Sequence, residues 1–186
     1  IVNKFNHLDL HVSTIHGTKK NISPFQKTDF IFGASQKSLE KISSSSSMVL
    51  ENWVDESRFN NYSRSEGKYF LYLGRFEPVK NPKRLIKAWK GIDHKLVMVG
   101  EGASKSEMQN LIEDLNLSDQ ISLEPETNDV AALFSKEKAL VISSDREGSP
   151  KVLFESLFCN VPVLSTKCGI MSNFLPASSL AEVDDE

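Results

Sequence analysis

The sequence lacks several features that would assign it at once to a functional class. It has two cysteines in 186 residues, Cys159 and Cys168, and neither lies at a spacing that metal ligands use. No apolar run approaches the roughly 20 residues of a membrane-spanning helix, and no secretory signal pattern is present. These residues therefore give no sign of a disulfide framework, a metal centre or a spanning helix. We expect two buried or loop thiols in a reducing, cytoplasmic compartment.

Charge of one sign is also scarce. The net charge is −3, which argues against a nucleic-acid-binding protein driven by phosphate contacts. With 39% hydrophobic and 25% charged residues, the composition is that of a soluble globular protein, and the length suits one domain or parts of two. The chain begins at Ile1 and ends soon after a strand and a glycine turn, so we expect a fragment of a longer protein.

Short apolar segments alternate with helix-length segments along most of the chain. We expect strands over 8–15, 28–35, 48–52, 69–73, 95–99, 120–123, 138–142 and 161–165. We expect helices over 36–42 with Ser35 as cap, 82–90 with Asn81 as cap, 104–115, and 128–135 with Thr127 as cap. This alternation with short connections predicts an α/β fold with a parallel sheet. The polar stretch 60–68 is typical of an interdomain linker between 1–59 and 69–186.

Two carboxylates, Glu147 and Glu155, lie eight positions apart. Ser149 followed by Pro150 predicts an N-cap and a first helical residue, so Glu147 lies on a strand-to-helix loop and Glu155 about one and a half turns inside the helix. The helix is apolar almost all round, which predicts burial, and a buried carboxylate needs a partner. One candidate is Lys151 at i,i+4, worth a few tenths of a kcal/mol; the other is a bound ligand.

A second charged element surrounds the start of the helix at Pro82. Lys80 lies at the positive end of this helix and Arg75 five residues earlier, where each cation is disfavoured by roughly 0.3–1 kcal/mol. A bound anion would reverse that sign, because helix N-termini favour anions. The alternatives are two solvated side chains or a cluster neutralised by Glu77.

These elements resemble a known family. Glu147-x7-Glu155, followed by Cys-Asn-Val-Pro-Val-Leu-Ser-Thr over 159–166 and by Gly169, resembles the donor-site signature of group 1 (family 4) retaining glycosyltransferases. Gly74-Arg75-x4-Lys80-Asn81 matches a second pattern of that family. The resemblance implies the GT-B fold, in which two Rossmann-like domains face each other across a cleft.

The first 59 residues resemble the end of the family's N-terminal, acceptor-side domain. A strand ends in His16-Gly17, and Asn52, Val54 and Asp55 match an Asn-Gly-Val-Asp element that precedes a Phe, although Trp53 replaces the glycine. Residues 69–186 would then form the C-terminal, nucleotide-sugar donor-binding domain.

The resemblance also implies roles for single residues. Arg75 and Lys80 would grip the donor diphosphate, Glu147 would hold sugar hydroxyls, Glu155 would accept hydrogen bonds from the ribose, and His16 would reach the donor sugar. The other implied donor-binding residues are Gly74, Gly100, Gly102, Glu124, Gly148, Ser149, Pro150, Lys151 and Val152. No metal and no cofactor is expected, since cationic side chains and a helix N-terminus serve the diphosphate of a UDP- or GDP-sugar.

The resulting expectation is a hexosyltransferase-type enzyme of polysaccharide or glycoconjugate biosynthesis. It would act with retention on a glycan or lipid-linked acceptor, in the cytoplasm, where the acceptor-side part could touch the inner face of a membrane. After Thr166 the sequence departs from the family, with Cys168 in place of a glycine and Ser172 or Asn173 near the position of a glutamate. A non-catalytic nucleotide-sugar-binding subunit therefore stays open, as does a sugar-nucleotide epimerase of the same fold. A transfer assay with a nucleotide-sugar panel separates them.

Overall fold

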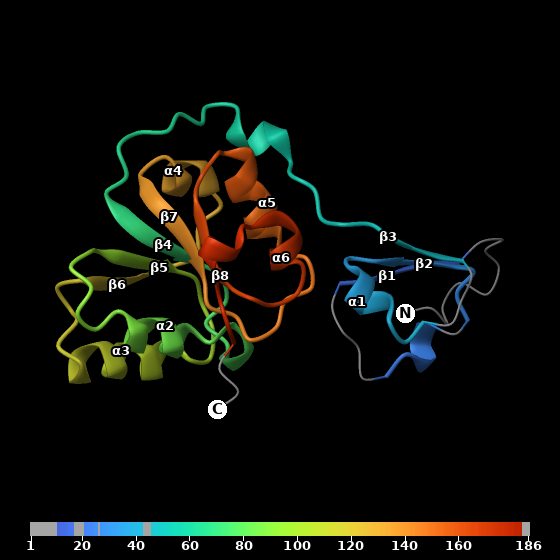
Figure 1. The fold of residues 1–186 in the computed structure, drawn as a ribbon, viewed down its shortest axis with the longest axis horizontal. Coiled ribbons are helices and arrows are strands. Elements are labelled where there is room, and N and C mark those ends of the chain that lie inside the picture. Colours follow the sequence, from blue (N-terminus) through green and yellow to red (C-terminus); the bar gives the residue numbers. More distant parts are fainter. Residues whose placement is uncertain (1–10, 17–20, 26, 43–45, 184–186) are drawn as a thin grey trace.

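The computed structural model describes residues 11–16, 21–25, 27–42 and 46–183, and these form two lobes of unequal size (Figure 1). The smaller lobe contains a three-stranded sheet and the larger lobe a six-stranded sheet. Every strand pair in both sheets is parallel, with helices along the connections. The predicted α/β fold with parallel, Rossmann-like sheets is confirmed.

The smaller lobe is built from β1 (Val12–Ile15), β2 (Phe30–Gly33) and β3 (Ser47–Val49), with η2 (Ser23–Phe25) in a stretch for which nothing was predicted. Its core is a small apolar cluster around Ile15, Ile31 and Leu39. The predicted cap at Ser35 is confirmed, since its hydroxyl accepts a hydrogen bond from the Ser38 N–H. The helix that it caps, α1 (Gln36–Leu39), is shorter than predicted.

Residues 50–68 connect the two lobes. They contain η3 (Glu56–Phe59), which Asp55 caps through a hydrogen bond from the Ser57 N–H. Phe59 is buried in the core of the larger lobe, and Val54 packs against the same cluster. The division of the chain at 59/60 and 68/69 stays a prediction, while this packing associates the chain with the larger lobe from Val54 onward.

The larger lobe carries the strand order β6-β5-β4-β7-β8-β9. Its strands are β4 (Tyr69–Leu73), β5 (Leu96–Val99), β6 (Ile121–Glu124), β7 (Glu137–Ile142), β8 (Val163–Thr166) and β9 (Leu180–Ala181). Its helices are η4 (Pro78–Lys80), α2 (Pro82–Ala88), α3 (Lys105–Asp114), α4 (Val130–Phe134), α5 (Lys151–Phe158), α6 (Met171–Phe174) and η5 (Ala177–Ser179). The chain thus builds the sheet outward from β4 in one direction, then returns to β4 and builds in the other.

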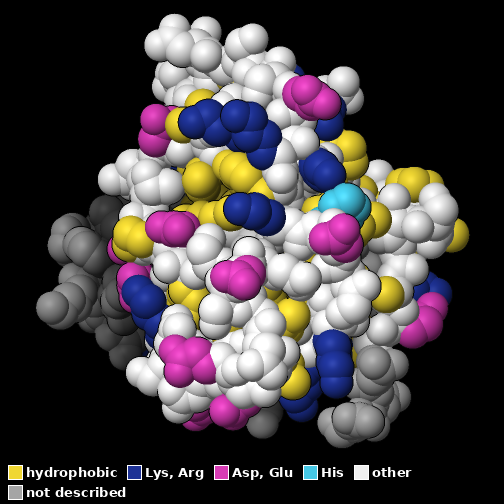
Figure 2. All heavy atoms as spheres, turned by 90° about the vertical axis from the view of Figure 1, so that its left-hand side faces the viewer, with side chains coloured by type: hydrophobic (Ala, Val, Ile, Leu, Met, Phe, Trp, Pro, Cys, Tyr) yellow, Lys and Arg dark blue, Asp and Glu magenta, His cyan; other side chains and the backbone are white. Residues whose placement is uncertain are grey.

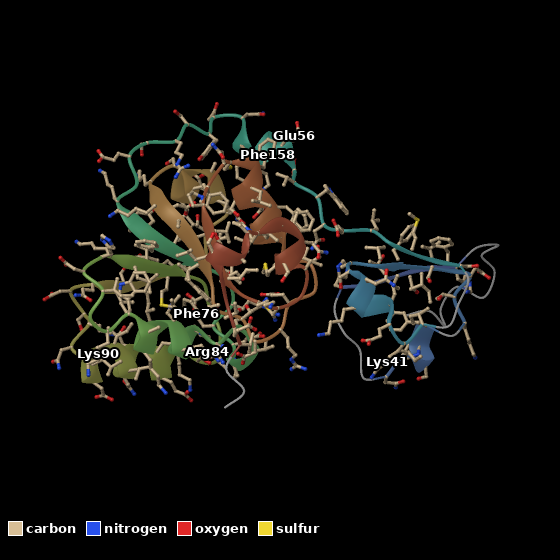
Figure 3. All side chains as sticks on the ribbon, viewed as in Figure 1. Lys41, Glu56, Phe76, Arg84, Lys90 and Phe158 are labelled. Carbon is tan, nitrogen blue, oxygen red and sulfur yellow. The ribbon has the colours of Figure 1, made fainter. Side chains whose placement is uncertain are left out.

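The two faces of this sheet pack against different helices, as the alternation of strand side chains requires. On β4, Leu71 joins the cluster that contains Phe134 of α4 and Leu153 of α5. Its neighbour Tyr72 joins the cluster of α2 and α3, together with Phe76, which is fully buried next to α2 (Figure 3). Figure 2 shows acidic and basic side chains interspersed over the face of this lobe that is turned away from the smaller lobe.

Two local predictions in this lobe meet different outcomes. Asn81 is the N-cap of α2, as predicted, and its side-chain oxygen accepts a hydrogen bond from the Arg84 N–H. The predicted cap Thr127 is wrong: Asp129 caps α4 through the Ala132 N–H, and the Thr127 hydroxyl instead accepts from the Asp129 N–H. Two short polar residues compete at this turn, and the one nearer the apolar run of α4 wins.

Both cysteines are free thiols. Cys159 is buried, and burial raises the pKa of its thiol to about 11, so the thiol is protonated and unreactive at neutral pH. Among the described residues, no helix is both long and apolar enough to cross a bilayer.

Candidate functional site

The candidate site lies where the sheet changes direction. β4 and β7 are neighbours, the strands that follow β4 extend to one side, and the strands that follow β7 extend to the other. In open parallel sheets ligands bind at the carboxyl ends of the strands at such a switch point, because the two outgoing loops diverge there. The loop over 74–81 leaves β4 and the loop over 143–150 leaves β7.

Polar contacts tie these two loops together. The Ser143 hydroxyl donates to the carbonyl oxygens of Lys80 at 3.0 Å and Asn81 at 3.2 Å. The Asp145 carboxylate accepts from the Asn81 amide at 3.0 Å and pairs with the Arg84 guanidinium at 2.9 Å. Asn81 itself adopts a left-handed backbone conformation, which turns the chain from η4 into α2. The loops therefore form one connected unit.

Lys80 and Glu147 form an ion pair at the centre of this unit. The Lys80 Nζ lies 2.7 Å from Oε1 and 2.8 Å from Oε2 of Glu147. The Ser144 hydroxyl donates a third hydrogen bond to Oε1 at 2.6 Å, and the Thr166 hydroxyl donates to the Ser144 carbonyl. The side chain of Glu147 is only 8% exposed. Two side chains, Lys80 and Ser144, thus donate three hydrogen bonds to this carboxylate.

Glycines let the neighbouring loops approach this unit closely. Gly169 has φ +57°, and a Cβ there would lie 2.6 Å from the Glu147 carbonyl oxygen. A side chain at Gly102 would lie 2.5 Å from the Phe76 carbonyl oxygen, and one at Gly100 would overlap the carbonyl oxygen of Gly74. These glycines thus support the two loops by backbone contact.

A cavity of about 230 Å³ opens over the Lys80–Glu147 pair. The predicted site residues that line it are Gly74, Arg75, Lys80, Glu147, Pro150, Lys151 and Val152. The lining residues that were not predicted are Tyr72, Leu73, Val141, Ile142 and Ser144. Tyr72 donates to the Arg75 carbonyl at 3.0 Å, and burial, with the charge of Glu147 next in size, raises the pKa of its hydroxyl. The tyrosine is therefore a neutral wall of the cavity.

The two predicted diphosphate residues have different surroundings. Lys80 is 21% exposed at its side chain, whereas Arg75 is 69% exposed and pairs with Glu77 at 2.7 Å. The alternative of a cluster neutralised by Glu77 thus describes Arg75, while Lys80 pairs with Glu147. Exposed pairs contribute about 0–1 kcal/mol, so the Arg75 side chain is easily reoriented toward a ligand.

Glu155 lies on the buried side of α5, with the residue 4% exposed. The predicted alternative partner Lys151 is wrong, because the ion partner is Arg58 of η3, whose Nη1 lies 2.8 Å from Oε1. The helix itself is less buried than its composition predicted, since Leu157 is 38% and Phe158 50% exposed, and the ring of Phe158 lies 5.7 Å from that of Phe59.

The predicted start of α5 also shifts by one residue. Pro150 is the N-cap, with an extended ψ of 129°, and Lys151 is the first helical residue. Ser149 does not cap the helix, because a tertiary contact uses its polar groups: its hydroxyl accepts from the Asn52 N–H at 3.3 Å, and its carbonyl accepts from the Asn52 side-chain amide.

Several other predicted residues do not line the cavity. Gly100 and Gly102 lie behind the loop that follows β4, and the carbonyl of Gly148 lies against Gly169. Glu124 is exposed at the end of β6, and His16 is exposed immediately after β1 in the smaller lobe. Within the described ranges, no group of three or more His, Cys, Asp or Glu side chains could hold a metal ion.

Tyr72, Ser144 and Arg58 are polar residues of the site that sequence reasoning missed. Ser144 is the second residue after the apolar strand β7, at the sheet edge where ligands bind, and that position was an available signal. Arg58 contacts a residue 97 positions away, so no local pattern could have indicated it.

Comparison with known proteins identifies the family. Residues 54–176, about two thirds of the chain, match the family described as glycosyl transferases group 1. The chain belongs to the group 1 glycosyltransferases. The matched region begins near the start of the connecting segment and includes both charged loops and the whole of α5.

Curated relatives of this glycosyltransferase chain agree. It is 32% identical over 178 residues to an N-acetylgalactosamine-N,N'-diacetylbacillosaminyl-diphospho-undecaprenol 4-alpha-N-acetylgalactosaminyltransferase of Campylobacter jejuni, covering 87% of this chain and 49% of the relative. It is 30% identical over 153 residues to the O-antigen chain mannosyltransferase RfbU of Salmonella typhimurium, covering 79% and 42%. The chain thus spans about half the length of these relatives.

Solved glycosyltransferase structures share the fold. TarM of S. aureus superimposes with a TM-score of 0.78 at 18% identity, covering 94% of this chain and 40% of TarM. Anabaena HepE in complex with UDP-glucose has a TM-score of 0.78 at 16% identity, covering 92% and 58%. The GT-B assignment of the fold is therefore confirmed, with the chain corresponding to part of each neighbour.

Proposed function

We propose that this chain binds the donor of a retaining glycosyltransferase, which moves a hexose-type sugar from a nucleoside diphosphate to a glycan or lipid-linked acceptor. The observation that carries the proposal is the Lys80–Glu147 pair, which two loops bring together in a cavity at the switch point of the sheet. This arrangement offers one cation and one hydrogen-bond acceptor side by side, where a sugar diphosphate needs both.

The chemical requirement is to stabilise a diphosphate leaving group and a sugar that develops positive charge. Fixed donors directed at the developing negative charge supply the first part. In our proposal Lys80, Arg75 and the first turn of α5 serve the diphosphate, since helix N-termini attract anions. Glu147, whose carboxylate is already held by Lys80 and Ser144, holds sugar hydroxyls. Glu155 accepts hydrogen bonds from the ribose.

The remaining assignments rest on family membership. Gly100, Gly102 and Glu124 would lie on the nucleotide side of the donor, and His16 would reach the donor sugar from the smaller lobe. HepE was solved with UDP-glucose and TarM with UDP, which supports UDP as the first nucleotide to test. The relative from Campylobacter is named for a diphospho-undecaprenol acceptor. A lipid-linked acceptor would bring the protein to the cytoplasmic face of a membrane.

Calorimetric titration with UDP, GDP and ADP tests the proposal directly. We expect one nucleoside diphosphate to bind and Lys80→Ala to weaken it by about ten- to a hundredfold, the scale of a lost charged hydrogen bond. Affinity for the matching nucleoside, which lacks phosphates, should change little.

Lys83→Ala is the matched control. Lys83 lies three residues further along and forms an exposed pair with Glu107 at 2.6 Å, so its loss should leave nucleotide affinity unchanged. Equal losses for nucleoside and nucleoside diphosphate in Lys80→Ala would indicate a disturbed fold and contradict the phosphate role. A nucleotide-sugar panel with acceptor then distinguishes a transferase from a binding subunit, which would bind without turnover.

A further inference from the structure

We propose that Arg58 is a positioning residue for Glu155, and that residues 52–58 of the connecting segment thereby couple the smaller lobe to the donor site. The inference rests on the proposed function and deepens it: it names a residue outside both charged loops that determines how the nucleotide ribose is recognised. Arg58 acts through Glu155 and does not itself touch the donor.

The geometry of the pair carries the first step. Arg58 donates from Nη1 to Glu155 Oε1 at 2.8 Å and from Nη2 to the Asn128 carbonyl at 3.4 Å, so both arms of the guanidinium are held. The Glu155 side chain is 6% exposed and that of Arg58 33% exposed. A carboxylate this deeply buried on an apolar helix needs a compensating charge, and Arg58 supplies it from the connecting segment.

The pair leaves half of the carboxylate for a ligand. Arg58 engages Oε1, and in the part of the chain that the structure describes no hydrogen bond reaches Oε2 of Glu155. An oriented carboxylate with one unused acceptor oxygen suits a ribose, whose hydroxyls are donors. Without Arg58 the carboxylate would lose both its counter-charge and its fixed orientation.

Asn52 provides a second attachment of the same segment. Its backbone N–H and its side-chain amide both donate to Ser149, two residues before α5 begins. Asn52 directly follows the residues that leave β3, so the chain runs from the smaller sheet to Ser149 and then to Glu155 (Figure 1). The connecting segment thus contacts both ends of the element between the two site glutamates, Ser149 through Asn52 and Glu155 through Arg58.

The experiment measures ribose recognition, not overall affinity. The association constant of the chain is determined for UDP and for 2′,3′-dideoxy-UDP, or for the GDP pair if GDP binds more tightly. The association constant for the ribose form is then divided by that for the dideoxy form, and this ratio is compared among variants. We expect Arg58→Gln and Glu155→Gln each to lower this ratio about tenfold, the scale of a charged hydrogen bond. The double variant should lower it no further, because both changes disable one carboxylate.

Two further variants make the test specific. Arg64→Gln is the control: Arg64 also lies on the connecting segment and donates to the Asn160 carbonyl just beyond α5, but it touches no site residue, so the ratio should stay at the wild-type value. Arg58→Lys keeps the charge and should recover about half of the logarithmic loss, which also covers the case that Arg58→Gln does not fold.

Each outcome decides one point. A ratio that falls in Glu155→Gln but not in folded Arg58 variants overturns the inference and leaves Arg58 a structural residue. If the ratio changes neither in Glu155→Gln nor in the Arg58 variants, the ribose role of Glu155 within the proposed function is contradicted. If UDP, GDP and ADP all fail to bind the wild-type chain, the proposed function fails and the inference fails with it.

Discussion

Two buried glutamates, Glu137 and Glu147, lie at opposite ends of β7 and have opposite surroundings. Glu137 begins the strand and is fully buried, and among the described residues neither of its carboxylate oxygens has a hydrogen-bond partner. Glu147 follows the strand and has Lys80 and Ser144 within 2.8 Å. Burial raises the pKa of Glu137 to about 8, so it is mostly protonated at neutral pH.

The difference shows that burial alone does not mark a functional carboxylate. At the amino end of β7 burial removes water and supplies nothing in return, which favours the neutral acid. At the carboxyl end the same sheet presents two loops whose donors, Lys80 and Ser144, hydrogen-bond to the Glu147 carboxylate. In our proposal only the carboxylate at this second end, Glu147, binds a sugar.

The largest expected effect is a pH dependence of stability that originates at Glu137. The unfolded chain releases this proton near the ordinary value of 4.5, whereas the folded protein keeps it up to about pH 8. Between these values the unfolded state binds fewer protons, so the free energy of unfolding should fall as pH rises, by about 3 kcal/mol from pH 5 to pH 8. Urea unfolding across this range measures it.

Glu137→Gln is the control for that effect, because it keeps the shape and removes the titration. The unfolding free energy of Glu137→Gln should change much less between pH 5 and pH 8 than that of the wild type. Parallel pH profiles of the two proteins would show that Glu137 ionises freely in the folded state, and the contrast between the two ends of β7 would disappear.

The next effect comes from making Glu147 resemble Glu137. Lys80→Met removes the ammonium and leaves a buried anion with only the Ser144 hydroxyl. Breaking a buried pair costs about 3–5 kcal/mol, and because Lys80 is partly exposed we expect about 2 kcal/mol at pH 7. Chemical unfolding beside Lys83→Met, which should lose less than about 0.5 kcal/mol, is the comparison. Equal losses in the two variants would refute the special position of Lys80.

A smaller effect is expected at Ser144. Ser144→Ala removes the third hydrogen bond to Glu147 without removing charge, and the loss should be about 1 kcal/mol of stability. In our proposal the effect on nucleotide-sugar affinity should exceed the effect on nucleoside affinity, because only the sugar end meets Glu147. Ser143→Ala serves as the neighbouring control, since Ser143 contacts backbone only. A loss confined to Ser143→Ala would contradict this ordering.

The smallest effect on stability belongs to Arg75. Its pair with Glu77 is exposed, so Arg75→Ala should change the unfolding free energy by less than about 0.5 kcal/mol. Its affinity for a nucleoside diphosphate should nonetheless fall several-fold, and the fall should shrink at high salt. Thermal unfolding and calorimetry on one preparation separate the two. A stability loss as large as that of Lys80→Met would show that the exposed pair is structural.

Much of the larger lobe could be predicted from the sequence, because its signals are local. The apolar run over 69–73 coincides with β4, and Asn81-Pro82 fixes the start of α2. The family signature identified both loops of the site. These features depend on neighbours within one turn or one strand, which a sequence displays directly.

The remainder depends on residues that meet across the fold. Ser149 was expected to cap α5, but Asn52 occupies its polar groups, and Lys151 was expected to pair with Glu155, but Arg58 does so. Glu137 was expected outside a strand that began at 138. It begins the strand, and Gly67 passes so close to its backbone that a Cβ there would lie 2.7 Å from the Glu137 carbonyl oxygen.

The glycine contacts behind the site have a consequence for how the protein can change its substrate. Surface loops usually tolerate insertions and exchanges, but a methyl group at Gly100 or Gly169 would strike the backbone of the loops that hold Lys80 and Glu147. The shape of the site is thus fixed by contacts between main-chain atoms. Selection for a new donor sugar should leave these glycines and the loop lengths intact and act on outward side chains such as Lys151 and Val152. Donor choice can then vary over a framework that hardly varies at all.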